Sequence, residues 1–135
     1  MPLDIRAMTP LLQVFDMPAA IRFYCDVLEF EVAMTDGKPV PDNDWVLLRR
    51  DGAELMLNTA YESGDRPPAA DERRMDAHRD TALYFGTPDV DAVRALLRAK
   101  GVDAPDPTVA PYGMKQLYVT DPDGYVLCFQ WRSDQ

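Results

Sequence analysis

An internal repeat constrains the fold of this chain more than any other feature, because the sequence matches itself after a shift of 73 residues. The shift aligns Asp16 with Asp89 and Ala19 with Ala92. In both copies the aspartate follows a strand-like run and precedes apolar residues at helical spacing, where it would cap the helix. Each half predicts a strand, a helix and about three further strands, so we expect two similar βαβββ modules.

Turn and cap signals divide each half into elements. The first module, about residues 8–59, predicts a strand at 9–15, a helix after Asp16, and a hairpin of strands 45–50 and 53–58 around Asp51-Gly52. The second, about 81–131, predicts a strand at 81–86, a helix from Asp89 to a C′ glycine at Gly101, and a hairpin of strands 116–120 and 125–131. The polar stretch 60–80 predicts a linker or mobile flap. We expect residues 1–135 to form a single domain.

Composition narrows the possible partners. A net charge of -9 argues against nucleic acid and favours neutral or cationic small molecules. The N-terminus lacks a signal-peptide pattern and no stretch approaches membrane-spanning length, so we expect no membrane association. Cys25 and Cys128 are too few for a disulfide framework, which predicts reduced thiols in a cytoplasmic protein.

Alternation along the predicted strands separates two faces of the sheet. One face is apolar and would form the core: Leu12, Val14, Leu55, Leu57, Leu83, Phe85, Leu117, Val119, Leu127 and Phe129. The other is polar and partly aromatic: Thr9, Leu11, Gln13, Glu54, Met56, Asn58, Ala82, Tyr84, Gln116, Tyr118, Val126, Cys128 and Gln130. Because buried polar groups without partners are costly, we expect this second face to be open to water or a ligand.

Several residues of the polar face carry more than one interpretation. Tyr84 and Tyr118 could stack a planar ligand or pack as core aromatics. Glu54 could anchor a ligand cation or be a surface carboxylate, and it is the best candidate for a catalytic base. Cys128 is expected to be an inert filler, since no positive neighbour would lower its pKa.

Residues near strand and loop ends could form the rim of a pocket. Trp45, Tyr112 and Trp131 are candidates, although dimer contacts or plain surface positions are equally consistent with the pattern. Tyr112 and Met114 precede the strand at 116–120 and could overhang the cavity. His78, in the predicted flap, is expected to be solvated together with Arg79.

Three separated motifs resemble the vicinal oxygen chelate superfamily, which includes glyoxalase I, bleomycin resistance proteins and extradiol dioxygenases. They are VFDMPAAIRFYCDVLEFEV at 14–32, PDVDAVRALLRAKGV at 88–102 and DPDGYVLCF at 121–129. The resemblance implies an α+β fold in which tandem βαβββ modules form a U-shaped mixed sheet around a cavity, with helices on the outer face. Glu29 departs from the family's usual glycine, at a cost of about 1 kcal/mol.

The resemblance also implies where a metal would be held in the family's enzymes. Carried over, those positions are Thr9, Ala82, Cys128 and either Glu54 or Met56, which lie on the same face. These side chains do not provide the imidazole, carboxylate or thiolate donors that a divalent metal needs. His78 precedes Ala82 by four residues, about 13 Å along a strand, and would need a loop to fold it back.

We therefore expect a metal-independent, homodimeric protein that binds a planar or cationic small molecule, closest in character to the bleomycin resistance branch. No cofactor is expected. The alternative is a glyoxalase-like lyase, isomerase or dioxygenase, which would need an atypical metal site or metal-free acid–base chemistry.

Overall fold

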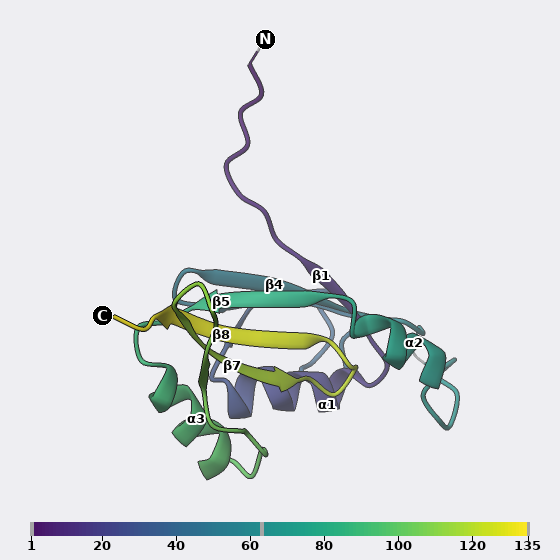
Figure 1. The fold of residues 1–135 in the computed structure, drawn as a ribbon. Helices are drawn as coiled ribbons and strands as arrows, with labels where there is room; N and C mark the ends of the chain where they lie inside the picture. Colours follow the sequence, from purple (N-terminus) through teal and green to yellow (C-terminus); the bar gives the residue numbers. More distant parts are fainter. Residues whose placement is uncertain (1, 63, 135) are drawn as a thin grey trace.

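The computed structural model describes residues 2–62 and 64–134 and has the predicted repeat of elements (Figure 1). The first module contains β1 (Leu11–Val14), α1 (Met17–Ile21), a π-helical turn η1 (Arg22–Val27), β2 (Glu31–Thr35), β3 (Trp45–Arg50) and β4 (Ala53–Thr59). The second contains β5 (Ala82–Gly86), α3 (Val90–Ala99), β6 (Thr108–Val109), β7 (Met114–Thr120) and β8 (Val126–Arg132). Between the modules lies α2 (Glu72–His78).

The strands form two four-stranded mixed sheets within the described residues, with the orders β1-β4-β3-β2 and β5-β8-β7-β6. Each order arises in the same way: the first strand of a module pairs in parallel with its last strand, and the remaining pairs are antiparallel. Helices α1 and α3 lie on the same side of the strand layer (Figure 1). The α+β architecture of duplicated modules is confirmed.

Burial confirms the predicted alternation of faces for most strand positions, but Gln116 and Cys128, which were predicted on the open face, are buried. The apolar face forms the core together with α1, η1 and α3, and Val14, Leu57 and Leu127 are completely buried. Leu11, Tyr84 and Tyr118 alternate with core residues and are exposed. This alternation could be predicted locally because successive strand side chains point to opposite faces whatever the strands pack against.

Both helix N-caps and the C′ glycine are confirmed as well. The carboxylate of Asp16 accepts a hydrogen bond from the Ala19 N–H, and that of Asp89 accepts one from the Ala92 N–H. Gly101 has a φ of +81°, which ends α3 in the left-handed conformation that glycine adopts without strain.

Two expectations about the connecting segments are wrong. Residues 60–80 include the helix α2, which is capped by Asp71, rather than only linker. Thr9 precedes β1, which begins at Leu11, so Thr9 is not part of the strand. Pro10 explains the short strand, since a proline has no N–H with which to continue the ladder.

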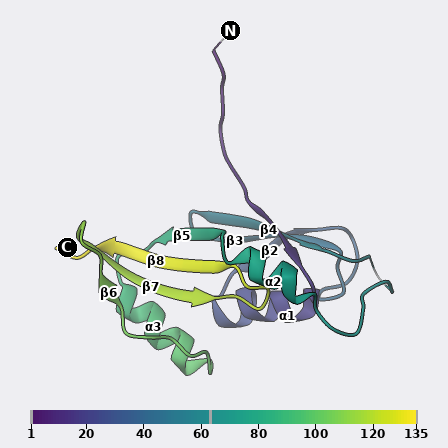
Figure 2. The ribbon, with the colours of Figure 1, turned by 45° about the vertical axis from the view of Figure 1, so that its right-hand side comes forward.

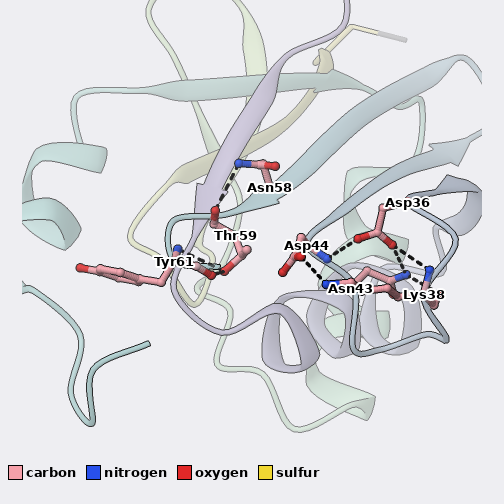
Figure 3. A network of polar contacts seen from close by, with 7 residues as sticks. All are labelled: Asp36, Lys38, Asn43, Asp44, Asn58, Thr59 and Tyr61. Carbon is pink, nitrogen blue, oxygen red and sulfur yellow. Dashed lines mark hydrogen bonds and ion pairs between the residues drawn. The ribbon is translucent and has the colours of Figure 1, made fainter. Parts of the chain in front are cut away.

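A polar network orders the loop between β2 and β3 (Figure 3). The Asp36 carboxylate accepts hydrogen bonds from the Asn43 side-chain amide and from the Asp44 N–H, which lower the pKa of Asp36 to about 2. The Asp44 carbonyl in turn accepts from the Thr59 N–H at the end of β4. The network thereby fixes the start of β3, where Trp45 enters the sheet.

Candidate functional site

The open face of the second sheet is dominated by a row of three side chains across β5, β8 and β7. Strand register places Tyr84 beside Cys128 and Cys128 beside Tyr118. The two tyrosine hydroxyls are 3.1 Å apart and the rings meet edge to face. Tyr84 is 52% exposed and Tyr118 40% exposed, whereas Cys128 between them is fully buried. The tyrosine pair therefore covers the thiol and presents two rings to solvent.

The tyrosine pair is continued by a chain of amide groups. The Tyr118 hydroxyl donates to Gln116 Oε1 at 3.3 Å. Gln116 Nε2 in turn donates to Gln130 Oε1 and to the Tyr112 hydroxyl, both at 2.9 Å. These bonds hold Gln116 and Gln130 in fixed orientations. Gln116 is buried beneath them, so the half-buried Gln130 is the ordered amide next to the exposed rings.

Two groups of this row, Tyr118 and Cys128, have raised pKa values. The hydrogen bond between the Tyr84 and Tyr118 hydroxyls raises the pKa of Tyr118 above its ordinary value. Burial likewise raises the pKa of the Cys128 thiol. Both groups stay protonated near pH 7, so Cys128 does not act as a thiolate nucleophile and Tyr118 does not act as a phenolate base. The prediction that Cys128 is an unreactive filler agrees with this position.

The first sheet contributes a smaller polar patch on its own open face. Gln13 Oε1 accepts a hydrogen bond from the Asn58 side-chain amide at 3.2 Å. Trp45 lies opposite Asn58 in the β3–β4 register and therefore shares this face. Leu11 and Met56 form the adjacent cross-strand pair. Strand pairing thus brings together five predicted site residues, one of which is Trp45.

Glu54 is held by a neighbour that the sequence analysis missed. Arg49 lies opposite it in the β3–β4 register, and its Nε and Nη2 both donate to Glu54 Oε2, at 2.8 and 2.5 Å. A ligand cation would therefore compete with Arg49 for this carboxylate. The Asp51-Gly52 turn could have revealed the pair, because a two-residue loop places residues 49 and 54 opposite each other.

The carried-over metal positions do not converge on a donor set. Thr9 lies outside β1, Ala82 has no donor, Cys128 is covered by the tyrosines, and Glu54 is paired with Arg49. Among the described residues no group of three or more His, Cys, Asp or Glu side chains could hold a metal ion. The residues present therefore do not fit the divalent metal of the family's enzymes.

The seam between the two modules contains a cleft with a volume of about 930 Å³. We call it the seam cleft. Its walls come from the start of β4, the end of η1, β5 and α3, and include Leu28, Phe30, Glu54, Tyr84, Phe85 and Val93. Glu54 and Tyr84 therefore belong to both the open face and the seam cleft.

The expectation that His78 is a solvated residue of a flap is wrong. It is half-buried, its Nδ1 donates to the Asp123 carbonyl at 2.6 Å, and its ring stacks on Tyr125 at 4.0 Å. These contacts attach α2 to the turn between β7 and β8. The capping aspartate Asp71 is the sequence signal that could have indicated the helix.

Duplicated βαβββ modules, with helices on one side and an open polar face on the other, define a protein of the vicinal oxygen chelate type. The family model for the Glyoxalase/Bleomycin resistance protein/Dioxygenase superfamily matches residues 7–129. The chain belongs to this superfamily. No curated protein matches its sequence.

Solved structures share the fold over nearly the whole chain. TnmS3, an antibiotic binding protein from Streptomyces sp. CB03234, is 25% identical with a TM-score of 0.69, covering 98% of this chain and 100% of its own. The bleomycin resistance determinant encoded on transposon Tn5 is 18% identical with a TM-score of 0.71, covering 95% of this chain and 98% of its own. TioX from Micromonospora sp. ML1 is 18% identical with a TM-score of 0.69, covering 94% and 99%. In the part of the chain that the structure describes, no helix is long and apolar enough to cross a membrane.

Proposed function

We propose that the protein binds a planar, preferably cationic small molecule on the Tyr84–Tyr118 face, without a metal ion. The observation that carries this proposal is the row Tyr84–Cys128–Tyr118, in which two exposed rings cover a buried thiol. The family resemblance implies that Cys128 occupies a metal-ligand position of the enzymes. Exposed aromatic rings beside fixed amide groups suit a ligand that stacks and accepts a few hydrogen bonds.

Charge favours a cation over an anion. The chain carries a net charge of -9, which attracts cations over a long range. A cation above a tyrosine ring gains about 0.5–1 kcal/mol at an exposed site and about 2 kcal/mol when desolvated. The functions printed for TnmS3 and the Tn5 determinant, antibiotic binding and bleomycin resistance, support the same class of activity.

The test is titration of the full chain with matched planar dyes: a cationic acridine, a neutral one and an anionic one. Binding is measured by calorimetry and by the rise in melting temperature, because a ligand that binds only the folded state stabilises it. We expect the cationic dye to bind most tightly. The proposal is wrong if none of the three dyes binds.

Substitutions at the two tyrosines locate the site. Removing a ring in Tyr84→Ala or Tyr118→Ala should weaken binding by about 1–2 kcal/mol, roughly 5- to 30-fold. Tyr118→Phe keeps the ring and removes the hydroxyl, so it should retain most of the affinity. Met34→Ala, at an exposed position on β2, is the control. Equal affinities of the alanine variants and the control would place the ligand elsewhere.

Measuring the metal content of the purified protein distinguishes metal-independent binding from a metal-dependent enzymatic activity. Protein purified without chelator is analysed for nickel, zinc, iron and manganese. Stoichiometric metal with turnover of an α-ketoaldehyde adduct or a catechol would replace the binding function with a glyoxalase-like or dioxygenase activity.

A further inference from the structure

The hydrogen bonds on the open face of the second sheet have a fixed direction. Gln116 Nε2 donates both of its hydrogens, one to Gln130 Oε1 and one to the Tyr112 hydroxyl, each at 2.9 Å. Gln116 Oε1 accepts from the Tyr118 hydroxyl at 3.3 Å. Because Tyr118 has a single hydroxyl hydrogen, the 3.1 Å contact between Tyr118 and Tyr84 requires Tyr84 to donate. Donation therefore runs in one direction, starting at Tyr84 and ending at Gln130 and Tyr112.

This direction leaves hydrogen-bond donors free at one end of the face. Gln130 Oε1 is occupied by Gln116, and the Gln130 Nε2 amide has no hydrogen-bond partner among residues 2–62 and 64–134. The Tyr112 hydroxyl also accepts from Gln116 and keeps its own hydrogen, on a side chain that is 70% exposed. We call these two groups, the Gln130 amide and the Tyr112 hydroxyl, the donor end. A ligand at this end meets hydrogen-bond donors and must supply an acceptor.

The opposite end of the face offers an acceptor instead. Tyr84 uses its only hydroxyl hydrogen on Tyr118, so the lone pairs of the Tyr84 oxygen remain for a ligand. The ring of Tyr84 is exposed beside this oxygen. A protonated amine suits the position, because it can donate to the oxygen and lie against the ring.

A gap in the layer of side chains lies next to the donor end. Figure 2 shows β8 between β5 and β7, and strand register places Gly86 of β5 beside Gln130 of β8. The φ of Gly86 lies outside the left-handed region, and a Cβ added there would make ordinary contacts with the Trp131 ring, the nearest at 3.5 Å. A strand glycine that neither conformation nor packing requires is typical of a position where a ligand approaches closely. The gap leaves the Gln130 amide accessible from the β5 side, with the Trp131 ring as a wall.

We infer that the ligand is an aromatic ketone or a similar planar molecule that carries a carbonyl acceptor at one edge and its cationic group at the opposite edge. The carbonyl oxygen accepts from the Gln130 amide and the Tyr112 hydroxyl, and the amine donates to the Tyr84 oxygen. Strand geometry separates Tyr84 from Gln130 by one strand spacing and two residues, about 8 Å between Cα atoms, which a small fused ring system spans. The inference rests on the proposed function and adds to it the chemical class and the direction of the ligand.

The test uses three planar tricyclic probes of the same shape: a fluorenone, a fluorene and a carbazole. Each carries the same dimethylaminomethyl group on the edge opposite to the variable position. At that position the fluorenone has an acceptor, the carbazole has an N–H donor, and the fluorene has neither. Calorimetry on the full chain should show the fluorenone binding about 3- to 10-fold more tightly than the fluorene, which is the net contribution of a hydrogen bond. The carbazole should bind no more tightly than the fluorene.

The outcomes distinguish this inference from the proposed function. Equal affinities of the three probes would agree with the binding of planar cations and would overturn the assigned direction. A preference for the carbazole would show that the free groups at the donor end are acceptors, which also overturns the inference. If none of the probes binds, both the proposed function and the inference are wrong.

Substitutions at the donor end locate the carbonyl group of the ligand. Gln130→Glu keeps an oxygen that accepts from Gln116 and removes the free amide hydrogens, so the ratio of fluorenone to fluorene affinity should fall to about 1. The ratio cancels the effect of the added charge, and Met34→Glu, which adds the same charge at an exposed position of β2, should leave it unchanged. Tyr112→Phe, a change at an exposed loop position, should lower the ratio about 2-fold. An unchanged ratio in both Gln130→Glu and Tyr112→Phe would overturn the inference.

Tyr84→Phe tests the position of the cationic group. The variant keeps the ring and removes the oxygen that accepts from the amine. All three probes should therefore bind about 2- to 5-fold more weakly, with an unchanged ratio of fluorenone to fluorene affinity. A lower ratio with an unchanged fluorene affinity would place the carbonyl beside Tyr84, and unchanged affinities of all three probes would place the amine elsewhere. Either result would refute the direction of the ligand.

Discussion

Replacing Gly124 by alanine should detach α2 from the rest of the protein. Gly124 lies in the turn between β7 and β8 and has a φ of +90°. A Cβ at this position would lie 2.3 Å from the Met75 carbonyl oxygen in α2, whereas ordinary contacts begin near 3.4 Å. The helix or the turn must therefore move by about 1 Å.

A matched glycine separates the steric effect from the cost of the backbone conformation. Gly113 has nearly the same φ, +88°, but a Cβ added there would have nothing within 4 Å. Alanine in this conformation costs about 1–2 kcal/mol, partly offset by the lower entropy of the unfolded chain. We therefore expect Gly113→Ala to lower the free energy of unfolding by about 1 kcal/mol.

Gly124→Ala should lose more because the contacts of α2 are lost as well. The hydrogen bond from His78 to the Asp123 carbonyl and the stacking of His78 on Tyr125 contribute about 0.5–1.5 kcal/mol each. The total loss is then about 3 kcal/mol. For a chain of this length the melting temperature should fall by roughly 10 °C, compared with about 4 °C for Gly113→Ala.

Urea unfolding gives the two free energies, and brief trypsin digestion reports on α2, which contains Arg73 and Arg74. Cleavage after these arginines should be faster in Gly124→Ala than in Gly113→Ala. Equal unfolding free energies and equal cleavage rates would refute the packing of α2 on this turn.

Two further predictions concern the folded body. Glu29 has a φ of +62° just after η1, a conformation that glycine adopts without strain. Glu29→Gly should therefore raise the melting temperature by about 2–4 °C, while Glu29→Ala, which keeps the Cβ, should leave it unchanged. Equal melting temperatures of the two variants would contradict this prediction. Burial raises the pKa of Asp123 from 3.8 to about 6, so between these values the folded state holds a proton that the unfolded state has released. Stability should therefore rise by about 2 kcal/mol as the pH falls from 7 to 4, and Asp123→Asn should reduce this rise. A wild-type stability that is flat or falling over this range in chemical denaturation would show the sign to be wrong.

Much of the fold could be predicted from the sequence because its signals are local. Strand alternation, the caps Asp16 and Asp89 and the C′ glycine Gly101 act through residues close in the chain. The same local rules placed Tyr84 and Tyr118 on one face. The Arg49–Glu54 pair was also within reach, since a single turn fixes its register.

The contacts and the solvent exposure of those residues were decided by the tertiary structure alone. Cys128 is covered because its strand β8 lies between β5 and β7, which place Tyr84 and Tyr118 on either side of it, 44 and 10 residues away in the chain. His78 packs on Tyr125 through a contact between segments separated by 47 residues. The seam cleft exists only where two sheets meet.

A single physical cause separates the features that could be predicted from the sequence from those that could not. Turn, cap and alternation preferences depend on dihedral angles and on neighbours within a few residues, so they can be deduced before the chain is folded. Whether a thiol is covered, a carboxylate is paired or a strand edge is left open depends on the relative positions of distant segments. In this protein the sequence determined which side chains face outward, and the packing of the two modules determined which of them remain accessible to solvent.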